Sequence, residues 1–172
     1  SDVIIDKDKF DFGAQQKGVF NSNFGTITPQ TPFSKSMEYP VRAYNAYVGL
    51  KFKDFTLSMF TNMNQSSSSF PSTGNNAIYN SDVFFRNTIT AVSAVYSKQI
   101  QDVTLTSKLS SNAFEISPES NYRNVFVNLE RGYKYGFETM RATEQQISWL
   151  ASNDLTLIGG VNYAIFEALP KT

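Results

Sequence analysis

A four-residue pattern of aspartate, an apolar residue, threonine and leucine occurs three times in this chain. It stands at 54–57, 102–105 and 154–157, so the copies are 48 and 52 positions apart. Each copy follows a few polar or charged residues and opens a run in which apolar and polar side chains alternate. Alternation with a period of two indicates a β-strand, and a short polar break before it indicates a tight turn. The repeat therefore predicts three β-hairpins in series.

The alternation also runs into each turn, so both strands of every hairpin are readable. The patterns predict strands at 42–52, 54–64, 84–97, 103–110, 138–151 and 155–165. The stretch 138–151 also fits one face of a helix, and we expect a strand because it enters its turn as the other two do. In 84–97 two alternating sets compete for the apolar face: Ile89, Ala91 and Val95 against Val92, Ala94 and Tyr96.

Long polar segments at 65–85 and 115–137 join one hairpin to the next, and both contain proline and glycine. Connections beyond about 12–15 residues are uncommon in compact soluble domains, whereas outer-membrane barrels combine short periplasmic turns with long outer loops. Strands of about 9–11 residues cross a membrane when tilted. The sequence therefore predicts an all-β fold: an antiparallel transmembrane β-barrel segment of consecutive long hairpins, with short periplasmic turns and long extracellular loops.

The chain divides into three parts. Residues 1–41 are predicted to be an irregular, loop-rich lead-in with room for a strand, because prolines interrupt 25–40. Residues 42–169 form the predicted barrel wall of three hairpins, and 170–172 begin the next loop. We expect one domain that belongs to a larger barrel, since an open run of six or seven strands leaves bare edges and a lipid-facing surface.

Composition favours strands that meet lipid on one side and polar surroundings on the other. Charged residues make up 17% of the chain, against about 25% in ordinary soluble domains, and aromatic residues make up 15%. No stretch approaches the ~18 apolar residues of a transmembrane helix, so a membrane would have to be crossed by strands. Phe52, Tyr96 and Trp149 lie beside the tight turns, where an aromatic belt would lie. The alternative is that aromatic residues simply favour hairpin ends.

Several classes of chemistry are excluded by residues that the chain lacks. It contains no histidine and no cysteine, which rules out Ser-His-Asp and Cys-His triads, disulfides and zinc sites built on these residues. Glu138 and Glu144 lie too far apart along one strand to act as a carboxylate pair. We therefore expect no enzyme activity, no cofactor and no metal site. The formal net charge of zero argues against nucleic acid as a partner.

The long loops and the strand ends beside them hold the residues most suited to ligand recognition. Aromatic rings offer stacking faces, arginines offer charged forks, and asparagines offer amides, which together suit sugars, peptides or chelates. The candidate ligand-binding residues are Phe70, Tyr79, Arg86, Asn87, Tyr122, Arg123, Asn124, Arg131, Tyr133 and Tyr135. The alternative for each of them is that it packs the loops against one another.

Four segments resemble barrel strands and outer loops of TonB-dependent receptors. They are Phe-Lys-Asp-Phe-Thr-Leu at 52–57, Tyr-Asn-Ser-Asp at 79–82, Asn-Tyr-Arg-Asn at 121–124, and the run 149–163 around the third turn. The resemblance covers 42–169. It implies an outer-membrane barrel of about 22 strands closed by an N-terminal plug, which imports bulky nutrients such as metal chelates, vitamins, oligosaccharides or peptides.

The same resemblance implies partners. They are outer-membrane lipid, the remainder of the barrel with its plug domain, a TonB-type energising complex in the inner membrane and, as a further candidate, a surface lipoprotein. Neither a plug nor a TonB box is recognisable in this chain. We therefore expect these residues to be part of a longer receptor in the cell outer membrane.

Two other interpretations stay open. A small structural or adhesive outer-membrane barrel of about eight strands would need two more strands from 1–41. A soluble β-sandwich that binds carbohydrate would be a water-soluble monomer. The long strands and the difference between short turns and long loops count against the sandwich.

Overall fold

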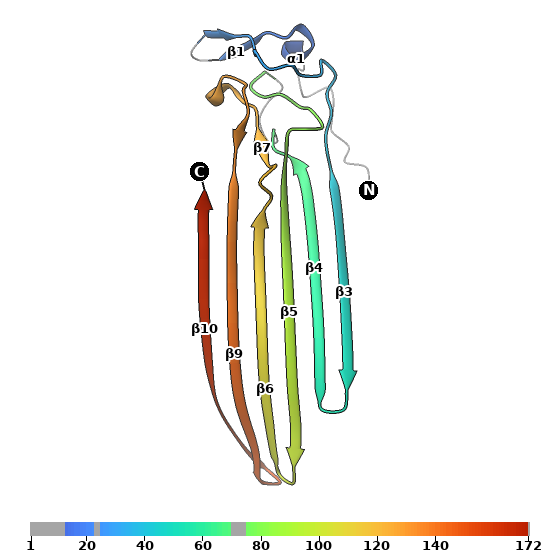
Figure 1. The fold of residues 1–172 in the computed structure, drawn as a ribbon, viewed down its shortest axis with the longest axis vertical. Coiled ribbons are helices and arrows are strands. Elements are labelled where there is room, and N and C mark those ends of the chain that lie inside the picture. The colour runs from blue at the N-terminus through green and yellow to red at the C-terminus, as the bar shows by residue number, and fades with distance from the viewer. Residues whose placement is uncertain (1–12, 23–24, 70–74, 172) are drawn as a thin grey trace.

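One six-stranded antiparallel sheet dominates the computed structural model of the chain, which describes residues 13–22, 25–69 and 75–171 (Figure 1). Its strands are β3 (Arg42–Phe52), β4 (Phe55–Ser67), β5 (Phe84–Ile100), β6 (Val103–Ile116), β9 (Tyr135–Ser152) and β10 (Leu155–Lys171). Each strand pairs with the long strand that follows it in the chain, in the order β3-β4-β5-β6-β9-β10. The prediction of an all-β fold built from antiparallel hairpins is confirmed, and β9 shows that 138–151 is strand.

The repeated aspartates lie at the turns of the three hairpins. The carbonyl oxygen of Asp54 accepts a hydrogen bond from the backbone N–H of Ser97 at 2.8 Å. That of Asp102 accepts one from the N–H of Leu150 at 2.9 Å. Two of the three copies therefore link their own turn to the neighbouring hairpin, which extends the sheet ladder across the turn itself.

The register divides the sheet into two faces, which we call the apolar face and the mixed face. The apolar face carries Tyr44, Val48, Leu50, Phe52, Phe55, Leu57, Met59, Met63, Val92, Ala94, Tyr96, Val103, Leu105, Leu109, Ile147, Trp149, Leu157, Val161, Tyr163 and Ile165. The mixed face carries many Ser, Thr and Asn residues, together with charged residues such as Lys108 and Glu144 and apolar residues such as Tyr47, Ile158 and Phe166. Because Tyr96 pairs with Phe55 and Ala94 pairs with Leu57, the set containing Val92 shares the apolar face of its neighbours.

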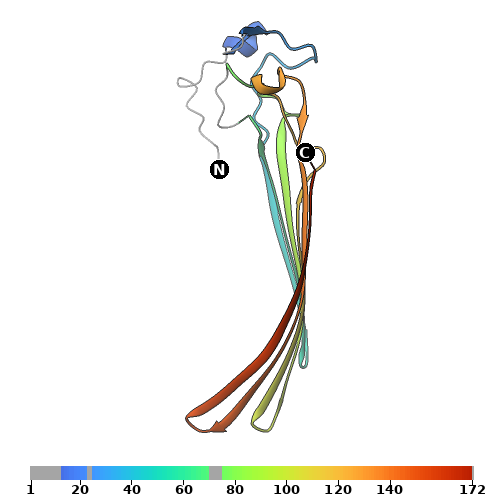
Figure 2. The same cartoon turned by 90° about the vertical axis from the view of Figure 1, so that its left-hand side faces the viewer.

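Both ends of the sheet are staggered in the same direction. At the turn end, Tyr96 of β5 pairs with Phe55, the first residue of β4, and β5 continues for four more residues. Trp149 of β9 pairs with Val103, the first residue of β6, and β9 continues for three more residues. At the loop end, β6 stops opposite Asn87, three residues inside β5. With a rise of about 3.3 Å per residue and a strand spacing of about 4.8 Å, this stagger corresponds to a strand tilt of roughly 45°. Figure 2 shows that the sheet also curves toward its turn end.

A compact loop assembly covers the opposite end of the sheet (Figures 1 and 2). Its short elements are α1 (Gly13–Lys17), β1 (Phe20–Ser22), β2 (Gly25–Ile27), β7 (Asn121–Tyr122), the 3-10 helix η2 (Val125–Val127) and β8 (Gly132–Tyr133). Its core is formed by Phe20, Ile78, Val83 and Leu129, each fully buried. The large apolar side chains of the sheet are instead exposed. No helix among the described residues is long and apolar enough to cross a membrane.

The strands extend further into the predicted loops than their polar sequence suggested. β4 continues to Ser67, and β10 continues to Lys171 although 170–172 were predicted to begin a loop; Thr172 lies outside the described residues. Pro170 pairs with Gly136 on β10, an edge strand. Proline has no N–H to donate, which an edge strand tolerates on the side where the described residues place no ladder partner.

Candidate functional site

Arg123 is fully buried at the centre of the loop assembly. Its Nε donates to the carbonyl oxygen of Leu129 at 2.8 Å, Nη1 to that of Pro32 at 3.1 Å and Nη2 to that of Thr31 at 2.9 Å. Burial lowers the pKa of the guanidinium, and the negative charge of Glu130 opposes this. Backbone oxygens thus occupy the guanidinium group of Arg123. This favours a role for Arg123 in packing the loops against one another over a role in ligand binding.

Glu130 also binds the lead-in segment, through the backbone and side chain of the residues just before Pro32. Its carboxylate accepts from the backbone N–H of Gln30 at 2.9 Å and of Thr31 at 3.1 Å, and it also accepts the hydroxyl of Thr31. The hydroxyl bond of Thr31 is the largest cause of a pKa below the ordinary glutamate value, followed by the two backbone bonds. Together with Arg123, Glu130 holds the lead-in segment against the second long loop.

Tyr79 and Asn124 also take structural positions. Tyr79 is buried, stacks on Tyr39 with ring centroids 6.5 Å apart, and donates its hydroxyl to the carbonyl oxygen of Ser69 at 3.3 Å. Burial raises the pKa of its phenol to about 12. Asn124 caps η2, because its Oδ1 accepts the backbone N–H of Phe126 at 3.1 Å.

Arg86 and Arg131 lie closer to solvent. Arg131 forms an ion pair with Asp82, and both side chains are partly exposed. Arg86 donates Nε to Gln65 at 2.9 Å and Nη1 to Glu119 at 3.1 Å. Its guanidinium lies 4.9 Å from the centroid of the Phe84 ring. Both arginines already have partners within the protein, so neither presents a free charged fork.

Of the remaining candidates, Tyr122 and Tyr133 lie on the paired strands β7 and β8 of the loop assembly, whereas Asn87 and Tyr135 lie on the large sheet. Tyr133 is 57% exposed, and Tyr135 is half-buried as the first residue of β9. Tyr122 packs so closely on Gly132 that a Cβ there would approach its ring to 2.6 Å. Asn87 is exposed on the mixed face of β5, outside the loop assembly. The last candidate, Phe70, lies outside the described residues.

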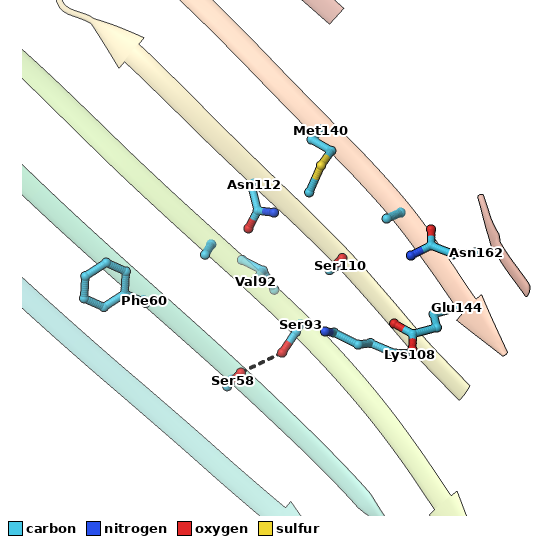
Figure 3. Close-up of a pocket in the computed structure, with 12 residues that line it drawn as sticks. Ser58, Phe60, Val92, Ser93, Lys108, Ser110, Asn112, Met140, Glu144 and Asn162 are labelled. Carbon is cyan, nitrogen blue, oxygen red and sulfur yellow. Dashed lines mark hydrogen bonds between the residues drawn. The ribbon is translucent and has the colours of Figure 1, made fainter. Parts of the chain in front are cut away.

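The mixed face contains several pockets that the sequence analysis missed. The first, of about 360 Å³, lies over the central strands and is lined by polar side chains that include Lys108, Glu144 and Asn162. Figure 3 shows Lys108 extending toward Ser93, which hydrogen-bonds Ser58 at 2.8 Å. The sequence signal was present, as polar residues alternate along every strand here, but only the register shows which of them meet.

The second pocket, of about 320 Å³, lies at the loop end of the same face. Asn64, Phe85, Asn87 and Phe114 line it from three adjacent strands, with Lys134 also in the lining. Asn87 is the only residue predicted as a ligand contact whose side chain lies on this face among the described residues. Its neighbours here were missed because they come from separate strands and belong to no local motif.

Neither the loop assembly nor the two faces offers a metal centre, since the described residues contain no group of three or more His, Cys, Asp or Glu side chains that could hold a metal ion. Comparison of the chain with protein-family models, with curated proteins and with solved structures finds no match.

Proposed function

We propose that this chain forms part of the wall and outer loops of a transport receptor in the bacterial outer membrane. The sheet would cross the membrane with its apolar face toward lipid and its mixed face toward the lumen. The tight turns would then lie on the periplasmic side and the loop assembly outside the cell. In this arrangement the receptor takes up a bulky nutrient with energy supplied by a TonB-type complex.

The observation that carries the proposal is the continuous apolar face. Large apolar side chains on it are strongly exposed: Leu50 is 63% exposed, Leu109 61% and Val161 72%. Water-exposed apolar patches of this extent are costly in a soluble monomer and typical of a surface that another apolar phase covers. Ser107 and Gln145 lie within this face and hydrogen-bond each other at 2.6 Å, which reduces the cost of placing them in lipid.

Strand length and tilt support the same arrangement. The six strands have between 11 and 18 residues, and a tilt of roughly 45° is close to the ~35–45° of outer-membrane barrels. At that tilt a strand of this length crosses the hydrocarbon region and continues beyond it. Charged side chains on the apolar face lie away from its middle: Glu115 and Arg141 lie toward the loop end of their strands, and Lys98 lies near the turn end of β5.

The two edge strands need further strands to pair with their free backbone groups. β3 and β10 each leave one side without a ladder partner among the described residues, and a membrane tolerates no unpaired backbone groups. Further strands must therefore pair with both edges. In our proposal they come from the remainder of the same barrel, with a plug domain inside it. A surface lipoprotein is a further candidate partner for the outer loops.

The other two interpretations gain less support. A small barrel of about eight strands needs two more long strands, whereas 13–22 and 25–41 contain only α1 and the three-residue strands β1 and β2. A β-sandwich needs a second sheet packed on the first, and the described residues form one large sheet with both faces exposed.

Fractionation of cells that express the native polypeptide containing this chain tests the proposal. We expect peptides from 42–169 in the outer-membrane fraction, resistant to salt and alkaline extraction, within a polypeptide much larger than 19.3 kDa. Uptake of its nutrient should stop when the proton-motive force is collapsed. Recovery of those peptides in the soluble fraction would refute the membrane assignment, and uptake that survives the collapse would refute the energised receptor.

A further inference from the structure

The pocket at the loop end of the mixed face combines aromatic rings with amides. Asn64 and Asn87 pair directly across β4 and β5. Phe85 stands two residues from Asn87 on the same strand, so both side chains point to the same side of the sheet. Phe114 contributes from β6, and all four line one pocket. With Asn62 and Asn112, which lie next along the same face, they form what we call the amide-aromatic patch.

The amides of the patch are available to a ligand. Within the part of the chain that the structure describes, the side chains of Asn62, Asn64, Asn87 and Asn112 make no hydrogen bond. Those of Asn64 and Asn87 are exposed and the other two are partly exposed. Each amide offers two donor hydrogens and one acceptor oxygen. Four such groups on three neighbouring strands give a surface dense in neutral donors and acceptors.

Few charged side chains lie around the patch: Glu138 pairs with Phe114 across β6 and β9, and the pocket itself is lined by two cations. The guanidinium of Arg86 is held by Gln65 and Glu119, which leaves Lys134 as the free cation among the described residues of the lining. An anionic metal chelate would require several cations to offset its charge in a half-enclosed site. The patch therefore suits a ligand that is neutral or carries one isolated charge.

From these features we infer that the amide-aromatic patch binds an oligosaccharide. A pyranose ring presents an apolar C–H face, which stacks on Phe85 or Phe114, and a rim of hydroxyl groups. Each hydroxyl both donates and accepts, as an amide does, so paired amides match neighbouring hydroxyls. This inference rests on the proposed function and names its ligand class: the sugar chain would enter under the loop assembly and lie along the lumen wall.

Saturation-transfer NMR on the full native polypeptide, purified in a zwitterionic detergent that carries no sugar headgroup, tests this inference. The probes are hexasaccharides of glucose, mannose, xylose and N-acetylglucosamine. We expect at least one of them to receive saturation. Asn87→Ala, an exposed substitution, should weaken its binding about tenfold, as loss of a hydrogen-bonding side chain in a ligand site does. Phe85→Ala should weaken binding to a similar extent.

Asn162→Ala is the matched control, because this asparagine is exposed on the same face but lines the pocket over the central strands instead. The affinity of the Asn162→Ala variant for the bound hexasaccharide should equal that of the parent protein. Binding by no probe, or equal binding by the parent and Asn87→Ala, would overturn the inference. So would cross-linking of a cysteine at position 87 to another segment of the polypeptide, because the patch would then be covered by protein.

This experiment separates the ligand from the membrane assignment. Outer-membrane localisation without sugar binding would leave the proposed function standing and reject the ligand class. Sugar binding that Asn87→Ala weakens, in a polypeptide recovered from the soluble fraction, would keep the ligand class and reject the membrane receptor.

Discussion

The guanidinium of Arg123 donates to the carbonyl oxygen of Thr31, 2.9 Å away and 92 positions earlier in the chain. This bond, with those to Pro32 and Leu129, joins the lead-in segment to the second long loop around a buried charge. The two segments share no sequence pattern. Their contact makes the loop ends of the hairpins a packed assembly. In the proposed receptor, this assembly would form a defined entrance to the lumen.

Replacement of Arg123 should loosen this assembly without unfolding the sheet. In Arg123→Ala one buried and two partly buried carbonyl oxygens lose their donors, and we expect the free energy for local opening to fall by about 2–4 kcal/mol. Hydrogen exchange would show faster exchange for 25–41 and 75–83 and unchanged exchange in the centres of β5 and β6. Arg131→Ala, which removes an exposed ion pair, should change exchange little. Equal effects of the two variants would contradict the conclusion that the hydrogen bonds of Arg123 hold the loop assembly together.

Glu130 should titrate below an ordinary glutamate. Its bonds from Thr31 and Gln30 favour the ionised carboxylate, which lowers the pKa of the folded state. The stability they contribute is present above the unfolded pKa of about 4.3 and is lost as pH falls through the lower folded pKa. The carboxyl carbon shift, followed by NMR, reports that pKa.

Thr31→Val removes the largest cause of the shift and should move the Glu130 midpoint up toward the ordinary value. Thr26→Val is a suitable control, because its hydroxyl bonds Asn21 rather than Glu130. A midpoint that is already ordinary in the parent protein would show that the carboxylate is not held by Thr31 in solution.

Tyr79 should be among the last tyrosines to ionise. Burial raises its pKa to about 12, so the stability it contributes is full below the unfolded pKa of about 10 and is lost as pH rises toward 12. Tyrosinate absorbance during an alkaline titration should show a late step that disappears in Tyr79→Phe. Tyr133→Phe, at an exposed position, is the control, and the late step should persist in it. A late step that persists in Tyr79→Phe belongs to another residue.

A charge on the apolar face should cost more than the same charge one residue away. Leu109→Arg would place a guanidinium near the middle of a membrane-crossing strand and lower the free energy of unfolding in lipid by about 2–4 kcal/mol. Ser110→Arg points to the mixed face and should cost much less. Urea unfolding of the native polypeptide in lipid vesicles compares the two, and equal costs would argue against a lipid contact at Leu109.

The hairpins could be predicted because their determinants are local. The turns at Asp54, Asp102 and Asp154 are marked by the repeat, and alternation defines the strands on either side. The first strand was predicted at 42–52, as β3 has it. The apolar face of 84–97 could not be chosen from its own residues, because both sets are apolar. Pairing with Phe55 and Leu57 decides it.

The loop assembly and the amide-aromatic patch could not be predicted in the same way. Arg123 reads as a free binding residue in sequence, and only the long-range contact with Thr31 shows that it is buried and occupied. Asn64 and Phe114 read as ordinary strand residues, and they meet Asn87 only through the register of three strands. Sequence patterns report neighbours along the chain, whereas both features are made by segments that are distant in it.

A lipid-accessibility scan along β6 tests the central claim most directly. The chain has no cysteine, so a cysteine introduced at each position of 103–116 gives one labelling site within it for a nitroxide. In outer membranes we expect collision rates with oxygen to peak at Leu105 and Leu109, and collision rates with a water-soluble nickel chelate to be higher at Thr106 and Ser110. A period of two with this phase supports a membrane wall. Equal access of the chelate to Leu109 and Ser110 would contradict it.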